Sequence, residues 1–183
     1  MKYSSDCDLL AVRFPYACEE IGKKELDLDQ DLFEKLGPTE NLPIGLIVQV
    51  KTGEYTQNDL KKSFSKDNLE YAIKRIGFAE KDKASDLAAG LMNCAKLIED
   101  DFILAKLAVL GETSSKQNSF IIKNIPEIDK FIRNRIKKHE NTKRADRMFF
   151  PDPLIQYLAG MGGDTNERFE KPIHRNVYIL SIL

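Results

Sequence analysis

The run Ile-Gly-Leu-Ile-Val-Gln-Val-Lys at Ile44–Lys51 most constrains how this chain can fold. An almost uninterrupted apolar run of this length is typical of a strand that is buried on both faces. Thr52 and Gly53 end it. A second apolar run, residues 8–14, stops at Pro15 and predicts another strand, because proline cannot donate to a ladder. We therefore expect a sheet in which Ile44–Lys51 is a central strand.

The remaining pattern alternates between predicted helices and strands. Helices are predicted at residues 31–36, 58–64, 67–76, 85–98 and 126–148, with a last one from Asp152, and strands at residues 102–110 and 119–122. Asp67 with Glu70 resembles a capping box, and Gly77 suits a helix C-cap. Ser85 is expected to cap a helix that turns Ala95 and Ile98 inward. This order of elements predicts an α/β domain with a mixed sheet.

Length and composition favour one globular domain. The chain has 183 residues, with 28 basic and 29 acidic side chains, so its global charge does not indicate a nucleic-acid partner. Residues 17–41 are expected to form a polar, acid-rich insertion, and a polar tail is expected from residue 164. The apolar stretch at residues 177–183 predicts an edge strand or self-association into a homo-oligomer.

Cysteine usage and hydropathy bear on the cellular setting. Cys7, Cys18 and Cys94 are odd in number and lack CxxC spacing, which favours a reduced, cytoplasmic setting and disfavours a zinc site. No signal peptide or membrane span is predicted, because the longest apolar run, residues 102–110, is too short to cross a bilayer.

Three polar residues stand where the two strongest predicted strands begin or end. Asp8 opens the first run, and Gln49 and Lys51 close the second. Side chains alternate along a strand, so Gln49 and Lys51 point the same way. If the two strands pair, a carboxylate, an amide and an ammonium group converge at one end of the sheet. Such a set suits a divalent cation and a phosphate.

The pairing of Asp-Leu-Leu-Ala-Val-Arg, from Asp8, with Ile-Val-Gln-Val-Lys, which ends at Lys51, resembles the PD-(D/E)xK nuclease superfamily. In that superfamily an Asp on one strand of a hairpin and an (E/Q)xK motif on the next form the metal site. Asp8 matches the Asp, with Asp6 as the fallback, and Gln49 and Lys51 match the (E/Q)xK pair. The resemblance implies a restriction-endonuclease-like fold, that is, a mixed central sheet flanked by helices.

The resemblance also implies roles for these residues. Asp8, the side-chain oxygen of Gln49 and the main-chain carbonyl of Val50 would bind Mg²⁺ or Mn²⁺. Lys51 would orient the attacking water or stabilise the phosphate. Two features depart from the family pattern. Residues 1–5 leave almost no room before the first strand, where many members carry a helix. Gln49 also replaces the commoner Glu, and a neutral amide binds Mg²⁺ more weakly than a carboxylate.

A basic segment forms a second candidate site. Arg133, Lys137 and Arg144 could contact the phosphates of DNA, although the charge pattern favours a solvated helix face over this interpretation. Three hypotheses follow from the sequence. The first is a metal-dependent nuclease that hydrolyses DNA phosphodiester bonds. The second is a catalytically inactive module of nuclease fold for nucleic-acid binding or protein assembly. The third is an unrelated α/β protein in which the motif is accidental.

Overall fold

The computed structural model of the protein describes residues 7–16, 29–37, 41–111 and 119–138. These residues divide between two compact units. Residues 7–16, 30–37, 41–111 and 119–127 belong to the first, which holds the sheet, and Asp29 with residues 128–138 belongs to the second. The predictions for residues 139–148, for a helix from Asp152 and for the apolar end at residues 177–183 lie outside the described residues.

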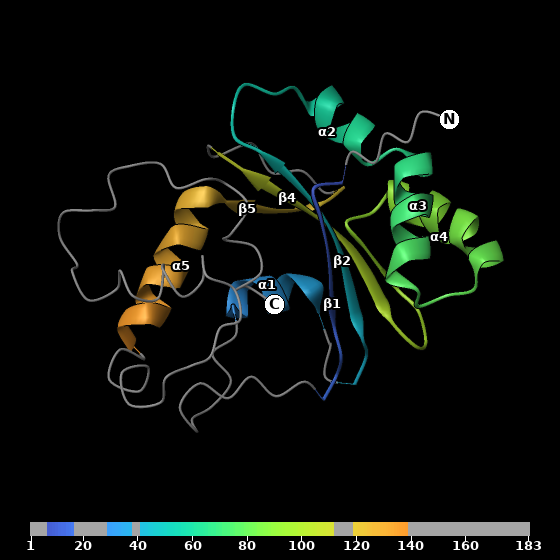
Figure 1. The fold of residues 1–183 in the computed structure, drawn as a ribbon, viewed down its shortest axis with the longest axis horizontal. Helices are drawn as coiled ribbons and strands as arrows, with labels where there is room; N and C mark the ends of the chain where they lie inside the picture. Colours follow the sequence, from blue (N-terminus) through green and yellow to red (C-terminus); the bar gives the residue numbers. More distant parts are fainter. Residues whose placement is uncertain (1–6, 17–28, 38–40, 112–118, 139–183) are drawn as a thin grey trace. The chain divides into compact units, whose positions relative to one another are not determined.

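The first unit is built on a mixed five-stranded sheet (Figure 1). Its strands are β1 (Leu9–Arg13), β2 (Ile44–Lys51), β3 (Lys96–Ile98), β4 (Ile103–Leu110) and β5 (Ile121–Asn124). β2 pairs with β1 antiparallel and with β4 parallel. The far edge of β4 is shared by antiparallel β3 at its beginning and parallel β5 at its end. The predictions of an α/β fold, a mixed sheet and a central Ile44–Lys51 strand are therefore confirmed.

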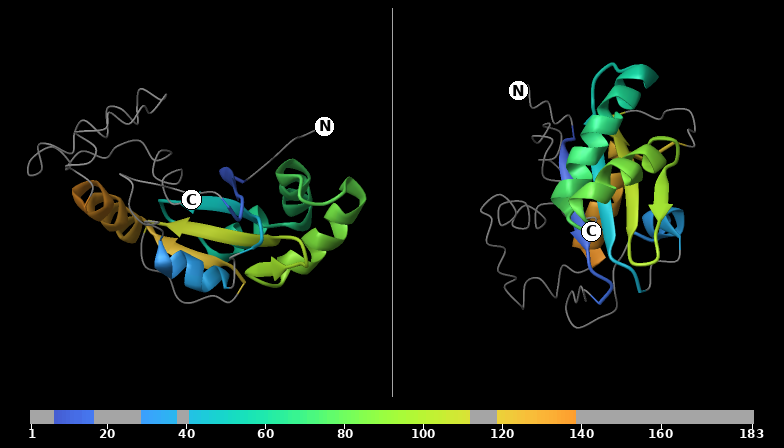
Figure 2. Two further views of the ribbon diagram at one scale, coloured as in Figure 1. Left: turned by 90° about the horizontal axis from the view of Figure 1, so that it is seen from below. Right: turned by 90° about the vertical axis from the view of Figure 1, so that its right-hand side faces the viewer.

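The described helices are α1 (Gln30–Leu36), α2 (Gln57–Ser63), α3 (Lys66–Ile76), α4 (Ala84–Met92) and α5 (Ile125–Lys138), with a 3₁₀ turn at Lys81–Lys83. α3 and α4 pack with the end of α2 on one face of the sheet, where Leu69, Ala88 and Phe64 join Ile47 and Leu104 in one apolar cluster. α1 lies on the other face, as the views in Figures 1 and 2 agree. No described helix has both the length and the apolar character needed to span a membrane.

Glycine makes the close approach of α3 to β2 possible. A Cβ atom built at Gly45 would lie 2.9 Å from Leu104 Cδ2 and 3.0 Å from Ile76 Cγ2, closer than such atoms pack. Gly77, at φ +78°, ends α3 in the left-handed conformation. The prediction of a C-cap at Gly77 is thus confirmed.

Two predicted helix boundaries are wrong. Ser65, not Asp67, is the N-cap of α3, and the capping box lies one helix earlier, where the hydroxyl of Thr56 and the carboxylate of Asp59 cap α2. α4 begins at Ala84 and ends at Met92, so it does not extend to residue 98. Instead Lys96–Ile98 forms β3, because its backbone pairs with the beginning of β4, and Ile98 is exposed rather than turned inward.

Lys106 is a cation in the middle of a strand that is otherwise apolar. It is 1% exposed, and its Nζ donates a hydrogen bond of 2.9 Å to the carbonyl of Met92, the last residue of α4. The same Nζ lies 5.6 Å from the centroid of the Phe64 ring. The negative end of the α4 dipole and the ring face both favour a positive charge there. Burial nevertheless lowers the pKa of Lys106 to about 8 from its ordinary 10.5.

Because of this lowered pKa, the free energy of unfolding changes with pH in the alkaline range. Between pH 8 and 10.5 the unfolded chain keeps the Lys106 proton and the folded protein releases it, so stability rises with pH. Against a Lys106→Met variant, we expect the wild-type free energy of unfolding to rise by about 2 kcal/mol from neutral pH to about pH 10, since each unit of pKa difference between the folded and unfolded states is worth about 1.4 kcal/mol. Urea denaturation at both pH values measures this difference. Equal pH slopes for the two proteins would contradict it.

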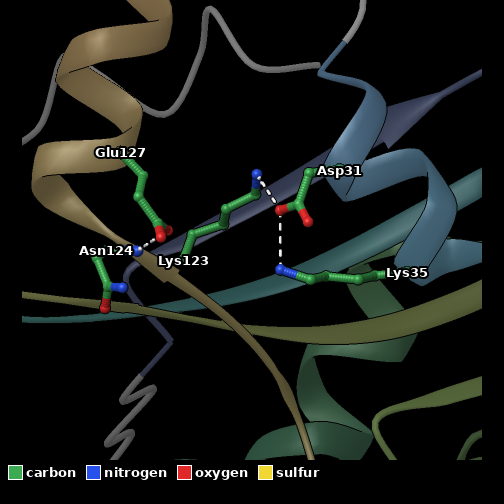
Figure 3. A network of polar contacts seen from close by, with 5 residues as sticks. All are labelled: Asp31, Lys35, Lys123, Asn124 and Glu127. Carbon is green, nitrogen blue, oxygen red and sulfur yellow. Dashed lines mark hydrogen bonds and ion pairs between the residues drawn. The ribbon is translucent and has the colours of Figure 1, made fainter. Parts of the chain in front are cut away.

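Two lysines from the sheet attach α1 to the opposite face. Lys96 Nζ donates to the carbonyls of Lys35 and Leu36 at the end of α1, at 3.0 and 2.8 Å. Buried Lys123, on β5, forms an ion pair of 2.6 Å with Asp31 in the first turn of α1. Figure 3 shows that Asp31 also accepts a hydrogen bond of 2.8 Å from Lys35. Together these bonds fix both ends of the helix.

We expect Asp31→Asn to loosen α1. The hydrogen bonds from Lys123 and Lys35 hold the pKa of Asp31 below its ordinary value, so its stabilising effect is present above about pH 4 and is lost as pH falls below that. Because the carboxylate is largely exposed, the expected cost at neutral pH is about 1 kcal/mol. Thermal unfolding at neutral and acidic pH measures it. Glu34→Gln, an exposed change on the same helix, is the matched control, and an equal effect of both would contradict the role of the ion pair.

Candidate metal and phosphate site

Pairing of β1 with β2 brings Asp8 and Gln49 into contact. Leu9 lies opposite Val48, and the Asp8 N–H donates to the Val48 carbonyl at 3.1 Å, so Asp8 lies beside the end of β2. Gln49 Nε2 donates to Asp8 Oδ2 at 2.5 Å, and the Val50 N–H donates to the same oxygen at 2.7 Å. The strands pair, and the predicted carboxylate and amide meet at one end of the sheet.

Three kinds of oxygen gather around this contact. The Asp8 side chain is exposed, whereas Gln49 is only 3% exposed. Gln49 Oε1 is buried and has no hydrogen-bond partner among the described residues. The Val50 N–H points toward Asp8, and because a strand residue directs its N–H and C=O to the same side, the Val50 carbonyl points there too. A carboxylate, an amide and a carbonyl oxygen are the hard ligands that Mg²⁺ takes.

These three oxygens could coordinate a divalent cation if one side chain changed its orientation. Gln49 now presents its Nε2 to Asp8, so a cation between the two side chains would need the amide to turn and present Oε1 instead. Asp8 is also the only acidic group in the contact. Within the described residues, no group of three or more His, Cys, Asp or Glu side chains is placed to hold a metal ion. Water and a substrate phosphate would therefore supply most of the coordination shell.

Lys51 lies two residues after Gln49 on the same strand and is half-buried. Alternation along β2 places its side chain on the Gln49 face, as expected. The contacts of the described residues join Asp8 to Gln49 and Val50 but do not join Lys51 to them. Hydrogen bonds from Thr56 lower the pKa of Asp59, and the Lys51 charge adds a smaller effect, so Lys51 lies within electrostatic range of the start of α2.

Neither Lys106 nor the exposed side of α3 is connected with this site by any sequence motif. Ile47 is the register partner of Lys106, so the buried ammonium group shares the Gln49 face of the sheet. A pocket next to Asp8 is lined by Asn68, Tyr71 and Arg75 of α3. Their spacing of three and four residues is the signal that could have been read, because it places all three on one side of a helix.

The predicted DNA-contacting residues are described in part. Arg133 and Lys137 are both exposed on α5, which confirms that they belong to one helix. Arg133 Nε forms an ion pair of 2.7 Å with Asp129 one turn earlier, which offsets part of its charge. Arg144 and the fallback residue Asp6 lie outside the described residues. A role for α5 in DNA binding stays a prediction.

Comparison of the chain with protein-family models, with curated proteins and with solved structures gave no match.

The contact between Asp8 and Gln49 makes Gln49→Glu an informative variant. It places two carboxylates within hydrogen-bond distance, and like charges so close cannot both ionise without cost. In metal-free buffer at about pH 8 we expect a loss of about 2 kcal/mol of unfolding free energy. Mg²⁺ or Mn²⁺ at millimolar concentration should restore this stability, because a cation bound between the two carboxylates would neutralise their repulsion. Thermal unfolding with and without metal measures the rescue.

Two comparisons separate geometry from metal binding. Lowering the pH to about 5 should also relieve the variant, because the pair then shares one proton. Gln57→Glu, an exposed change at the start of α2, should respond to neither treatment. Relief by acid without rescue by metal would uphold the contact and contradict the cation site.

Proposed function

We propose that this protein is a metal-dependent nuclease of restriction-endonuclease-like fold that hydrolyses phosphodiester bonds in DNA. The observation that carries the proposal is the contact of Asp8 with Gln49. The side-chain oxygen of Gln49 is buried and has no partner among the described residues. The resemblance of the Asp8 and Gln49-Val50-Lys51 segments to the PD-(D/E)xK superfamily supports the same conclusion. In the superfamily the motif residues lie on two adjacent strands, and in this chain Asp8 and Gln49 lie at the ends of the paired strands β1 and β2.

The order of elements around the site also supports the proposal. The antiparallel pair β1–β2 carries the candidate residues, and helices α2, α3 and α4 follow before β4 returns parallel to β2. This connection leaves Asp8 at the beginning of an edge strand and Gln49 and Lys51 at the end of a central strand. Ends of parallel strands are common ligand sites in α/β sheets. Of the two residues in contact, Asp8 is exposed and could meet a polymer, whereas Gln49 lies behind it.

Each residue has a chemical role under this proposal. Asp8, the Gln49 amide oxygen and the Val50 carbonyl would hold Mg²⁺ or Mn²⁺, which supplies Lewis acidity and a more acidic water when bound. Lys51 places a positive charge near the phosphate, where negative charge develops during hydrolysis. Gln49 in place of Glu leaves the cation one anionic ligand fewer. We therefore expect metal binding to be weak and to depend on the substrate phosphate.

One observation favours the second candidate function, an inactive module of the same fold. A single oxygen of Asp8 already accepts hydrogen bonds from Gln49 and from Val50, as it would in a purely structural link between β1 and β2. A protein that retained this link but had lost the metal would keep the sheet without catalysis. Such a module would bind DNA, or a protein partner, independently of divalent cations.

Cleavage assays test the first function directly. Supercoiled plasmid and single-stranded DNA are incubated with Mg²⁺ or Mn²⁺ and the wild-type protein, Asp8→Asn or Lys51→Ala. Asp8→Asn keeps an oxygen for the Val50 N–H, so the strand pairing should survive while the anionic ligand is lost. We expect metal-dependent cleavage by the wild type and a rate at least about 100-fold lower in both variants.

Lys81→Ala is the matched control, because Lys81 is an exposed lysine of the same unit outside the site. Its cleavage rate should equal that of the wild type. DNA retention on a gel without cleavage, unchanged in Lys51→Ala, would support the inactive module instead. Cleavage that persists in Asp8→Asn would contradict both the site and the resemblance.

A further inference from the structure

A pocket of about 240 Å³ lies beside Asp8, between the start of β1 and helix α3. Asn68, Tyr71, Ala72 and Arg75 line it from α3, and Asp8 and Leu10 line it from β1. The α3 residues follow the spacing of one helix face, so the pocket wall is a regular feature of α3. Sites that enclose a whole small-molecule ligand measure roughly 300–1,000 Å³. This pocket therefore suits one unit of a larger ligand.

The chemistry of the wall combines a flat ring with a cation. The Arg75 guanidinium lies 5.8 Å from the centroid of the Tyr71 ring, in cation–π contact. Tyr71 is 40% exposed, an unusually large area for a ring that already has a partner. An aromatic ring stacks on any nucleobase, and a guanidinium group binds phosphate through its fork of N–H groups. The two groups together match a nucleotide.

Asn68 adds a fixed hydrogen-bonding group. Its Nδ2 donates to the carbonyls of Lys62 and Ser63, at 3.3 and 3.1 Å, where α2 ends. Because both bonds use the amide nitrogen, the side-chain oxygen is the atom that Asn68 offers to a ligand. Such an oxygen accepts from the N–H edge of a base. The acceptor is held in place before any ligand arrives.

Local charge favours the same class of ligand. The segment from Gln57 to Ile76 carries five basic residues and three acidic ones, although the whole chain is nearly neutral. Lys61, Lys62 and Lys66 are all exposed on the chain that leads into α3. A cluster of exposed cations attracts phosphates along a strand. This part of the surface therefore suits a polyanion.

We propose that the α3 pocket binds one unpaired nucleotide of a single-stranded nucleic acid, with its base on Tyr71 and its phosphate at Arg75. A base inside a duplex is stacked between its neighbours and does not reach such a ring. The pocket thus selects single strands or unpaired ends. Asp8 lines the same pocket, so the adjoining phosphodiester would lie at the metal site; this last point rests on the proposed nuclease function, whereas nucleotide binding does not.

Binding without cleavage tests the proposal. Fluorescence anisotropy with a labelled strand of about ten nucleotides, in EDTA, compares the wild type with Tyr71→Ala, Tyr71→Phe and Arg75→Ala. We expect Tyr71→Ala and Arg75→Ala each to weaken binding about tenfold and Tyr71→Phe to retain it, since the ring is kept. A duplex of the same sequence should bind more weakly than the single strand. Circular dichroism confirms that each variant is folded.

Lys74→Ala is the matched control. Lys74 precedes Arg75 on the same helix but forms an ion pair with Glu70. Its removal should change affinity less than about twofold, because an exposed paired lysine contributes little. An equal loss in Lys74→Ala and Arg75→Ala would reduce the effect to general charge and would overturn the pocket.

Cys7 provides a second readout that does not rely on variants. The Cys7 thiol lines the pocket, whereas the Cys94 thiol does not. A bound strand should slow the alkylation of Cys7 by N-ethylmaleimide and leave Cys94 unchanged, as measured on peptides by mass spectrometry. Equal rates at Cys7 with and without the strand would overturn the proposal.

The outcomes separate this proposal from the nuclease function. Tyr71-dependent binding and Cys7 protection without metal-dependent cleavage would uphold the pocket and reject the nuclease. Metal-dependent cleavage that needs Asp8 and Lys51 but tolerates Tyr71→Ala, with no preference for single strands, would uphold the nuclease function and reject nucleotide binding in the pocket.

Discussion

The parallel pairing of β2 with β4 is the interaction on which the rest of the structure depends. All eight residues of β4 and the first six of β2 are buried, so helices must cover both faces of this pair. The core on the α3 and α4 face is continuous from Ile47 and Leu104 to Leu91. The candidate metal and phosphate site lies where this burial ends. Gln49 is the last buried residue of β2, and the exposed carboxylate of Asp8 meets it there.

Lysines connect the buried sheet to the helices that cover it. Lys106 reaches the end of α4, Lys96 reaches the end of α1, and Lys123 reaches the first turn of α1. A lysine has a long apolar stem that packs in a core and a charged head that satisfies carbonyls or a carboxylate at its edge. Helix C-termini suit this head because their last carbonyls lack partners within the helix. The helices are therefore held in place by specific polar bonds as well as by apolar packing.

The elements and contacts that the sequence predicts correctly are those that depend on a local pattern or on a single strand pairing. Ile44–Lys51 and the strand near residues 102–110 were predictable because long apolar runs dominate them. The sequence pattern predicts a helix for Lys96–Ile98. This prediction is wrong because the conformation of the segment is set by its pairing with β4 and not by its own pattern. The contact between Asp8 and Gln49 is predictable because it requires only the alternation of side chains along a strand and the pairing of β1 with β2. The Lys106 contact with Met92 and the α3 pocket depend on how helices pack on the sheet, which periodicity does not specify.

Two buried amide oxygens bear on whether the contact at the end of β2 is a structural link or a binding site. A link between β1 and β2 needs only an Asp8 oxygen that accepts from the Val50 N–H, and it gains nothing from burying Gln49 Oε1 without a partner, which costs about 1–3 kcal/mol. Asn124 Oδ1 is a second buried oxygen without a partner among the described residues. The register aligns Lys51 with Leu110 and Leu110 with Asn124, so Gln49 and Asn124 lie on the same face of the sheet, in adjoining rows. β4 separates the two strands that carry these acceptors. The proposed cation and phosphate would use such acceptors, whereas a structural link between β1 and β2 alone leaves them unexplained.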